Sequence, residues 1–197
     1  QKMANFLFHL LSNYSAANLG DSLCWDHFWR ALLEYLRLFK LKITVSQRAN
    51  LFPSENTQQI SQTELAGLIA WIQLAESVAL QDIEAQHQFI ENNAWLCIDT
   101  SVGLLCSGVP LLLKGALYRF LAALAYDESG ASKIWMSMNA HSVLTLTQEG
   151  KLLGIQQELE ERECAAKTFV SSLGFLNLMK PLLLRLATSD DCIHSAP

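Results

Sequence analysis

The stretch GLLCSGVPLLLKGALYRFLAALAY, residues 103–126, most constrains how this chain can fold, because it is the most apolar part of it. From Val102 to Leu113 the chain has twelve uncharged residues, short of the ~20 that a helix needs to cross a bilayer. Lys114 and Arg119 follow, and two charges near the centre of a span would cost on the order of 5 to 7 kcal/mol. The prediction is therefore helix buried in protein, and no membrane span.

Pro110 divides this stretch into two helices. Proline disfavours helical geometry at the residue before it, Val109, and suits the first turn of a new helix. We therefore predict a helical hairpin with a very short turn. In its second helix the apolar stripe is Leu113, Leu117, Phe120, Leu121 and Leu124, and the predicted exposed edge is Lys114, Tyr118 and Arg119.

Helical spacing recurs along most of the chain. In residues 21–40 the apolar positions keep it throughout, with Asp21 or Ser22 as the cap. Ser61 and Glu64 have capping-box spacing and predict a helix of about 18 residues. Shorter patterns cover residues 2–13, 82–92, 129–139 and 155–180, the last with a break expected near Gly174 or before Pro181.

The fold class predicted from these patterns is all-α, because no segment shows sustained period-two alternation. Helix pairs begin near residues 61, 94 and 129, a rhythm typical of stacked antiparallel pairs in HEAT- and ARM-like α-solenoids. We predict one continuous stretch, 1–197, of a larger α-solenoid, with an exposed loop at 41–60 and a polar tail at 188–197. The start at Gln1, without signal-peptide features, suggests a fragment.

Composition argues against several kinds of partner and site. Only 17% of residues are charged and the formal net charge is -5, with no basic block to follow a phosphate backbone, so no nucleic acid is expected. The cysteines Cys24, Cys97, Cys106, Cys164 and Cys192 form no C-x-x-C pair. This spacing indicates neither a disulfide framework nor a zinc site, and it fits a reducing compartment.

Candidate catalytic groups do not converge in the sequence. The five histidines His9, His27, His87, His141 and His194 lie in separate segments and are interpreted as surface or rim residues. Cys97 and Cys106 are interpreted as packing residues, and the tryptophans Trp25, Trp29, Trp71, Trp95 and Trp135 mostly as core. We therefore predict no catalytic, cofactor-binding or metal-binding residues, and no enzyme.

The acidic cluster ELEERE, residues 158–163, allows two interpretations. It is either a carboxylate pair or metal-ligand set, or the solvated face of a helix that starts near Gly154. Glu158, Glu161 and Arg162 fit the solvated face, and glutamates near a helix start interact well with its dipole. We favour the solvated face.

Four segments in this order resemble a known family. They are WDHFWRALLEYLRLF (25–39), ISQTELAGLIAWIQLAESV (60–78), GLLCSGVPLLLKGALYRFLAALA (103–125) and GIQQELEERECAAKTFVSSLGFLNLM (154–179). Together they resemble the amino-terminal half of the largest inner-ring scaffold nucleoporins, the nucleoporin 205/192-type α-solenoids of the nuclear pore complex. Phe169-Val170 stands where many members have an aromatic residue followed by proline, and 40–60 matches no family segment, so the chain looks like a divergent member.

The resemblance implies an architectural role at the nuclear envelope. Members hold the inner ring together, capture short linear motifs of adaptor nucleoporins, help to anchor the FG-repeat channel complex and so support nucleocytoplasmic transport. Other nucleoporins and flanking repeats of the same chain are the expected partners, with no partner-binding residue assigned. Two alternatives remain: a soluble helical-repeat transport receptor or cargo adaptor with a strongly charged inner surface, and an all-α enzyme.

Overall fold

The computed structural model describes residues 24–48, 61–144, 147–148, 151–152 and 154–186, with only the backbone for 39–48, 147–148 and 151–152. The predicted helix at 2–13, the cap at Asp21 or Ser22, residues 49–60 of the predicted loop and the tail at 188–197 lie outside these ranges.

The described elements are almost all helical. In chain order they are α2 (Trp25–Arg48), α3 (Gln62–Gln81), α4 (Ile83–Glu91), α5 (Cys97–Leu105), α6 (Leu111–Leu124), α7 (Glu128–Ala140), strands β1 (Thr147–Gln148) and β2 (Lys151–Leu152), α8 (Gly154–Gln157), the π-helix η1 (Glu158–Glu163), α9 (Cys164–Ala166) and α10 (Val170–Leu186). The two strands form a minimal antiparallel hairpin, a small addition to the predicted all-α class.

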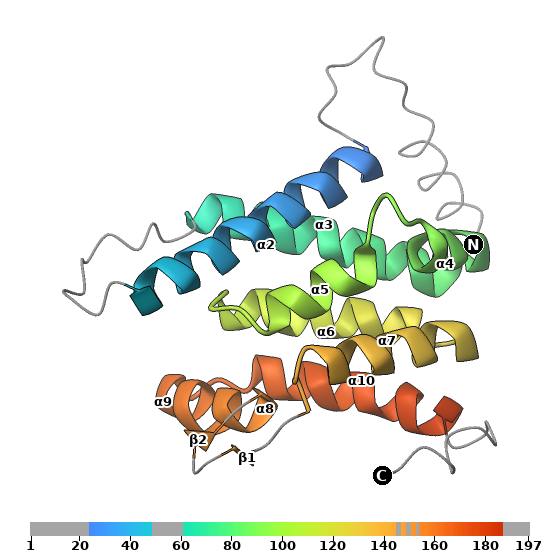
Figure 1. Ribbon diagram of the computed structural model, residues 1–197. Helices are drawn as coiled ribbons and strands as arrows, with labels where there is room; N and C mark the ends of the chain where they lie inside the picture. The colour runs from blue at the N-terminus through green and yellow to red at the C-terminus, as the bar shows by residue number, and fades with distance from the viewer. Residues whose placement is uncertain (1–23, 49–60, 145–146, 149–150, 153, 187–197) are drawn as a thin grey trace.

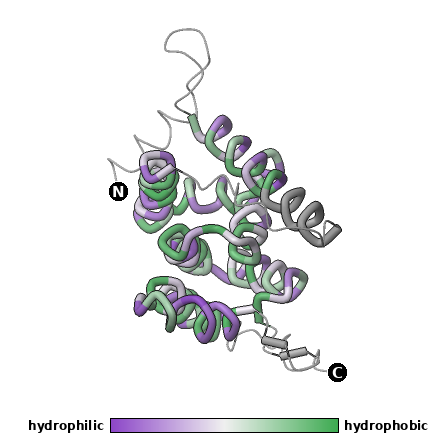
Figure 2. Tube along the Cα trace, turned by 90° about the vertical axis from the view of Figure 1, so that its left-hand side faces the viewer, coloured by the Kyte–Doolittle hydropathy of each residue, from purple (hydrophilic) through white to green (hydrophobic). Residues whose placement is uncertain are grey.

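The helices stack in two rows (Figure 1). One row contains α2, α5 and α7, and the other contains α3, α6 and α10, with contacts between successive members of each row. Figure 2 shows the rows as two columns of helices seen nearly along their axes. This is the arrangement of stacked helix pairs in an α-solenoid, so the predicted fold class is confirmed.

α6 is the central helix, because it lies between α3 on one side and α10 on the other. The predicted stripe is fully buried: Leu113, Leu117, Phe120, Leu121 and Leu124 each have 0% exposure. The predicted exposed edge is wrong at two of its three positions. Lys114 and Tyr118 are only 4% and 3% exposed, because α8, η1 and α10 cover the side of the helix that a single hairpin would leave open.

An aromatic cluster fills the core between α2, α3, α4 and α6. Trp25 and Trp29 each meet Phe89 edge to face, and Trp29 also lies 5.3 Å from Phe120 between ring centroids. Such geometry suits aromatic rings, whose faces are negative and edges positive. The core assignment is confirmed for Trp25, Trp29 and Trp95, while Trp71 and Trp135 are half-buried.

Helix starts follow the sequence signals closely. The Ser61 side chain accepts a hydrogen bond from the Glu64 amide at 3.2 Å, as the capping-box spacing predicts. Asp82 and Asp127 cap α4 and α7 in the same way, through the amides of Glu84 and Gly130. Each side chain satisfies an amide that has no partner inside its own helix.

Two predicted boundaries are wrong. α2 continues to Arg48, so the first eight residues of the predicted loop at 41–60 are helical. The break in 155–180 falls at Lys167, which has a left-handed backbone (φ 53°), while α10 runs through both Gly174 and Pro181. A left-handed residue after a helix is a common stop signal, and here it precedes the first turn of α10.

Gly174 continues its helix because it lies at a close crossing of α6 and α10. A Cβ there would lie 3.0 Å from the Gly115 carbonyl oxygen, and a Cβ on Gly115 would lie 2.5 Å from Val170 Cγ1. The distance at Gly115 is too short for a real side chain and the one at Gly174 is at the lower limit, so glycine on both helices permits the contact.

Among the described residues, α3 is the one helix with the length and mean hydropathy to cross a membrane. Core helices of other proteins meet the same criteria. α3 buries Ile72, Ala75, Val78 and Ala79, and Glu76 on this helix pairs with Arg119 of α6.

Candidate functional site

The acidic cluster of residues 158–163 forms the π-helix η1. In an α-helix, residues five apart point about 140° away from each other. Hydrogen bonds from i to i+5 in a π-helix bring them nearly onto one side. Glu158 and Glu163 are therefore both buried, at 7% and 0% exposure, while Glu161 is exposed and Arg162 half-buried. The predicted solvated face is wrong for Glu158, although α8 does begin at Gly154 as expected.

Glu158 is held between two cations. Its Oε2 pairs with Lys114 Nζ, and its Oε1 lies 2.7 Å from Arg162 Nη1. Arg162 Nη2 also donates to the Val109 carbonyl at 3.1 Å, which ties η1 to the turn between α5 and α6. Burial lowers the pKa of Lys114, and the neighbouring Glu158 carboxylate opposes this effect. The Lys114–Glu158–Arg162 group is called the charged cluster below.

Glu163 has a separate role as the cap of α10. Its Oε1 accepts the Ser171 amide at 2.6 Å, and its Oε2 accepts the Ser172 amide at 3.0 Å and the Ser172 hydroxyl. A carboxylate is well placed at a helix start, where free amides and the helix dipole are positive. The two buried glutamates of η1 thus fasten α6 and α10 to the same short segment.

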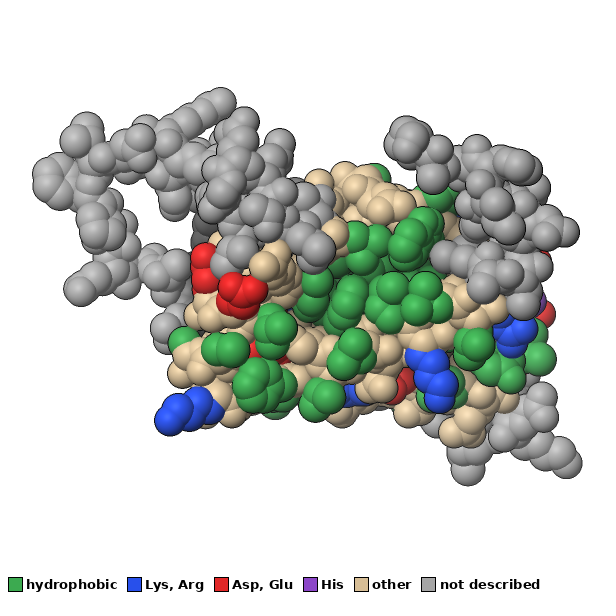
Figure 3. Space-filling view, turned by 90° about the horizontal axis from the view of Figure 1, so that it is seen from below, with side chains coloured by type: hydrophobic (Ala, Val, Ile, Leu, Met, Phe, Trp, Pro, Cys, Tyr) green, Lys and Arg blue, Asp and Glu red, His purple; other side chains and the backbone are tan. Residues whose placement is uncertain are grey.

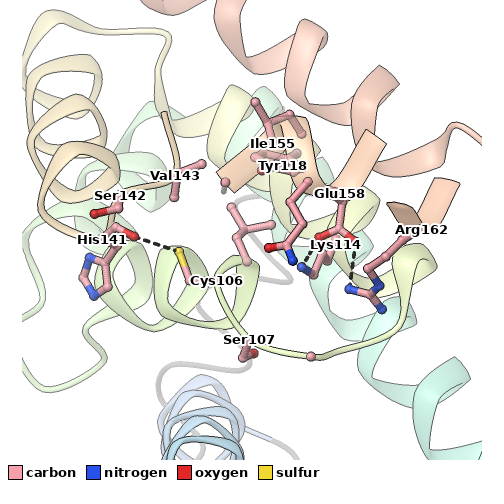
Figure 4. Close-up of a pocket in the computed structure, with 14 residues that line it drawn as sticks. Cys106, Ser107, Lys114, Tyr118, His141, Ser142, Val143, Ile155, Glu158 and Arg162 are labelled. Carbon is pink, nitrogen blue, oxygen red and sulfur yellow. Dashed lines mark hydrogen bonds and ion pairs between the residues drawn. The ribbon is translucent and has the colours of Figure 1, made fainter. Parts of the chain in front are cut away.

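A pocket of about 570 Å³ lies beside the charged cluster, and we call it the junction pocket (Figure 4). It is lined by residues 105–108 of the α5–α6 turn, Lys114 and Tyr118 of α6, 141–143 after α7, and Gly154, Ile155, Gln157, Glu158 and Arg162. Two hydrogen bonds tie its walls together. The Cys106 thiol donates to the His141 carbonyl at 3.3 Å, and the Ile155 amide donates to Val143 at 3.2 Å.

Tyr118 is the unusual member of this lining. Its ring packs edge to face on Phe175 of α10, at 5.7 Å between centroids. No hydrogen bond reaches its hydroxyl from any residue that the structure describes. Burial strongly raises the pKa of Tyr118, so the hydroxyl keeps its proton and remains a donor.

The structure does not bring the other predicted candidates together. His27 and His87 are exposed and His141 is half-buried, as interpreted from the sequence, while His9 and His194 lie outside the described residues. Cys97 is a packing residue whose burial raises its thiol pKa, but Cys106 is exposed, contrary to prediction. Within the described ranges no group of His, Cys, Asp and Glu has the arrangement of a metal site.

Sequence reasoning missed the charged cluster because it gave residues 155–180 regular α-helical spacing up to a break near Gly174 or Pro181. The turn in η1 changes which residues share a face, and no pattern in ELEERE marks that change. The one available signal was Lys114, a cation that follows fourteen uncharged residues (100–113) and precedes four more before Arg119. Such a residue needs a carboxylate partner if the helix is covered on every side.

Comparison with known proteins identifies the family of this chain. The family described as "Nuclear pore complex scaffold, nucleoporins 186/192/205" matches residues 1–196. The chain is 26% identical over 192 residues to Nuclear pore complex protein Nup205 of Homo sapiens, covering 91% of this chain and 9% of that protein. With the Drosophila melanogaster protein of the same name it shares 24% identity over 188 residues, with the same coverage. The chain therefore spans about a tenth of the length of these relatives and belongs to the family of nuclear pore complex scaffold nucleoporins 186, 192 and 205.

Proposed function

We propose that this chain is a structural segment of the inner-ring scaffold of the nuclear pore complex, located at the nuclear envelope. Its role is to continue a long superhelix that holds short linear motifs of adaptor nucleoporins and supports nucleocytoplasmic transport. The family membership and the two stacked rows of helices support this role. The role is non-enzymatic and involves neither nucleic acid nor a membrane span, with α3 packed against protein.

The observation that carries the proposal is the open face of α10. Leu173, Leu176 and Leu183 are 61%, 61% and 57% exposed on the side opposite α6, and Leu184 is 62% exposed. Figure 3 shows hydrophobic side chains gathered over this face of the molecule. Apolar patches of this kind mark a missing partner. In a solenoid the next repeat buries such a face.

The occupant we assign to the α10 face is a flanking repeat of the same longer protein. The relatives are about ten times as long as the part that this chain matches, so their chains are long enough to contain such repeats. The stack of α3, α6 and α10 also continues in that direction (Figure 1). Other nucleoporins are then bound by the assembled superhelix.

The test is affinity capture of the tagged full-length protein, as wild type and as Leu176→Asp. We expect the wild type to localise to pores and to recover inner-ring adaptor and channel nucleoporins. Leu176→Asp should lose much of both, because it places a charge in the contact with the flanking repeat. Asn177→Asp, on the next exposed position, is the matched control and should behave as wild type. Recovery of soluble cargo alone would favour a transport receptor instead.

A further inference from the structure

The junction pocket has more hydrogen-bond donors than acceptors to match them. Lys114 has three N–H groups and uses one on Glu158, and the Arg162 guanidinium uses one of its five in a hydrogen bond, to the Val109 carbonyl. Arg162 faces Glu158 Oε1 as an ion pair, without a hydrogen bond to that oxygen. The Tyr118 hydroxyl adds a donor that no described residue satisfies. Lys114 and Tyr118 are only 4% and 3% exposed, and donors on buried side chains favour an oxygen acceptor from outside.

The charge of the lining points the same way. Lys114 and Arg162 are cations, and Glu158 is the one carboxylate among the lining residues that the structure describes. Counting Lys, Arg, Asp and Glu alone, the described lining residues have a formal surplus of one positive charge. The nearby carboxylate of Glu163 is already engaged by the amides of α10, and Glu161 lies on the exposed side of η1.

Part of the pocket wall is apolar, and the size of the pocket suits part of a peptide. Leu105, Val143 and Ile155 line it beside the charged cluster, as Figure 4 shows for the last two. A volume of about 570 Å³ is within the range of ligand-binding pockets. Such a site holds an apolar side chain against these walls while a neighbouring carboxylate reaches the donors.

We propose that the junction pocket binds a short segment of a partner protein through an Asp or Glu side chain flanked by an apolar residue. The carboxylate takes hydrogen bonds from Tyr118 and Lys114 and lies beside Arg162, which offsets the surplus positive charge. This inference rests on the proposed scaffold function, because that function makes protein segments the relevant ligands.

The test selects short random peptides, displayed on phage, on the immobilised full-length protein. The key variants are Gln157→Glu and its matched control Gln156→Glu. Gln157 lines the pocket and Gln156 does not, yet each donates one hydrogen bond to the glutamate four residues later, at 2.9 and 2.8 Å. Gln157→Glu therefore adds a carboxylate to the pocket, and Gln156→Glu adds the same charge outside it.

We expect the selected peptides to carry an acidic residue next to an apolar one. Measured by fluorescence anisotropy, the best synthetic peptide should bind Gln157→Glu at least about tenfold more weakly than wild type, and Gln156→Glu almost equally. Replacing its acidic residue with the amide should cause a similar loss. Tyr118→Phe should weaken binding about fivefold, while Tyr126→Phe, at an exposed tyrosine elsewhere, should have no effect.

The inference is overturned if no peptide is enriched, if Gln157→Glu binds as wild type, or if the amide peptide binds equally well. These outcomes leave the scaffold proposal standing, because that proposal is judged by pore localisation and nucleoporin recovery. The scaffold proposal would instead be overturned if the wild-type protein bound peptides in the pocket but neither localised to pores nor recovered nucleoporins.

Discussion

The two sides of α6 are joined to the rest of the molecule by different chemistry. On the side of α2, α3 and α4, aromatic rings and aliphatic side chains make most of the contact, with Phe120 between Trp29 of α2 and Phe89 of α4, and the Glu76–Arg119 ion pair lies at its edge. On the α10 side, the contact combines a glycine crossing with the charged cluster and the Glu163 cap. The first contact, called the apolar joint below, tolerates changes of side-chain shape better than changes of charge. The second contact, on the α10 side and called the polar joint below, depends on specific ion pairs and hydrogen bonds. It can therefore also present hydrogen-bond donors to a ligand.

The largest effect should come from a charge in the apolar joint. Phe120→Asp buries a carboxylate at a position of 0% exposure and removes two ring contacts, so we expect a loss of about 5 kcal/mol or more. The measurement is the free energy of opening of this segment, from hydrogen exchange in the full-length protein. Leu117→Asp should behave similarly, and amides of α6 that stayed fully protected in either variant would contradict this assignment of the buried face.

The next effect tests the charged cluster. Lys114→Met leaves Glu158 buried with only Arg162 as a partner, and we expect a loss of about 3 kcal/mol in the same opening free energy. The double variant Lys114→Met with Glu158→Leu should recover most of this loss, because it removes both buried charges. A double variant that is less stable than Lys114→Met alone would show that the pair stabilises the joint beyond mutual neutralisation.

The glycine crossing should respond more weakly. Gly115→Ala places a Cβ 2.5 Å from Val170 Cγ1 and 2.8 Å from the Val170 carbonyl oxygen, and should lower the opening free energy by about 2 kcal/mol. Gly67→Ala in α3 is the matched control, because nothing lies within 4 Å of its added Cβ. There, alanine should raise local stability by about 0.5 to 1 kcal/mol through helix propensity. Equal effects at the two glycines would rule out a tight crossing.

The smallest effect is expected for Arg119→Ala, below about 1 kcal/mol, because its ion pair with Glu76 is long, at 3.5 Å, and partly exposed. Burial raises the pKa of Glu76 despite this arginine. In the folded state this carboxyl therefore holds its proton more tightly than in the open state, and stability falls as pH rises from 4.5 through the folded pKa.

Removing Arg119 raises the pKa of Glu76 further. The stability lost in Arg119→Ala should therefore be present at pH 7 and vanish near pH 4. Comparison of hydrogen exchange at the two pH values checks this, and a cost independent of pH would contradict the pairing.

The apolar joint was predictable from the sequence and the polar joint was not. Positions such as Leu113, Leu117 and Phe120 repeat with helical spacing, and burial follows from that spacing in any stacked arrangement. Whether Lys114 and Tyr118 are exposed depends on segments 44 or more residues later in the chain, because Glu158 of η1 pairs with Lys114 and Phe175 of α10 packs on Tyr118. Local periodicity contains no information about such a contact.

The sequence by itself determined most of the helices, the Ser61 cap, the short turn at Pro110 and the family, because each depends on residues close together in the chain or on their order. Only the tertiary structure decided that ELEERE is a π-helix with two buried glutamates, that Gly174 lies inside a helix, and that a donor-rich pocket opens beside Lys114. These features arise where α6, η1 and α10 meet. Burial there changes the free energy of a charge far more than local sequence preference does.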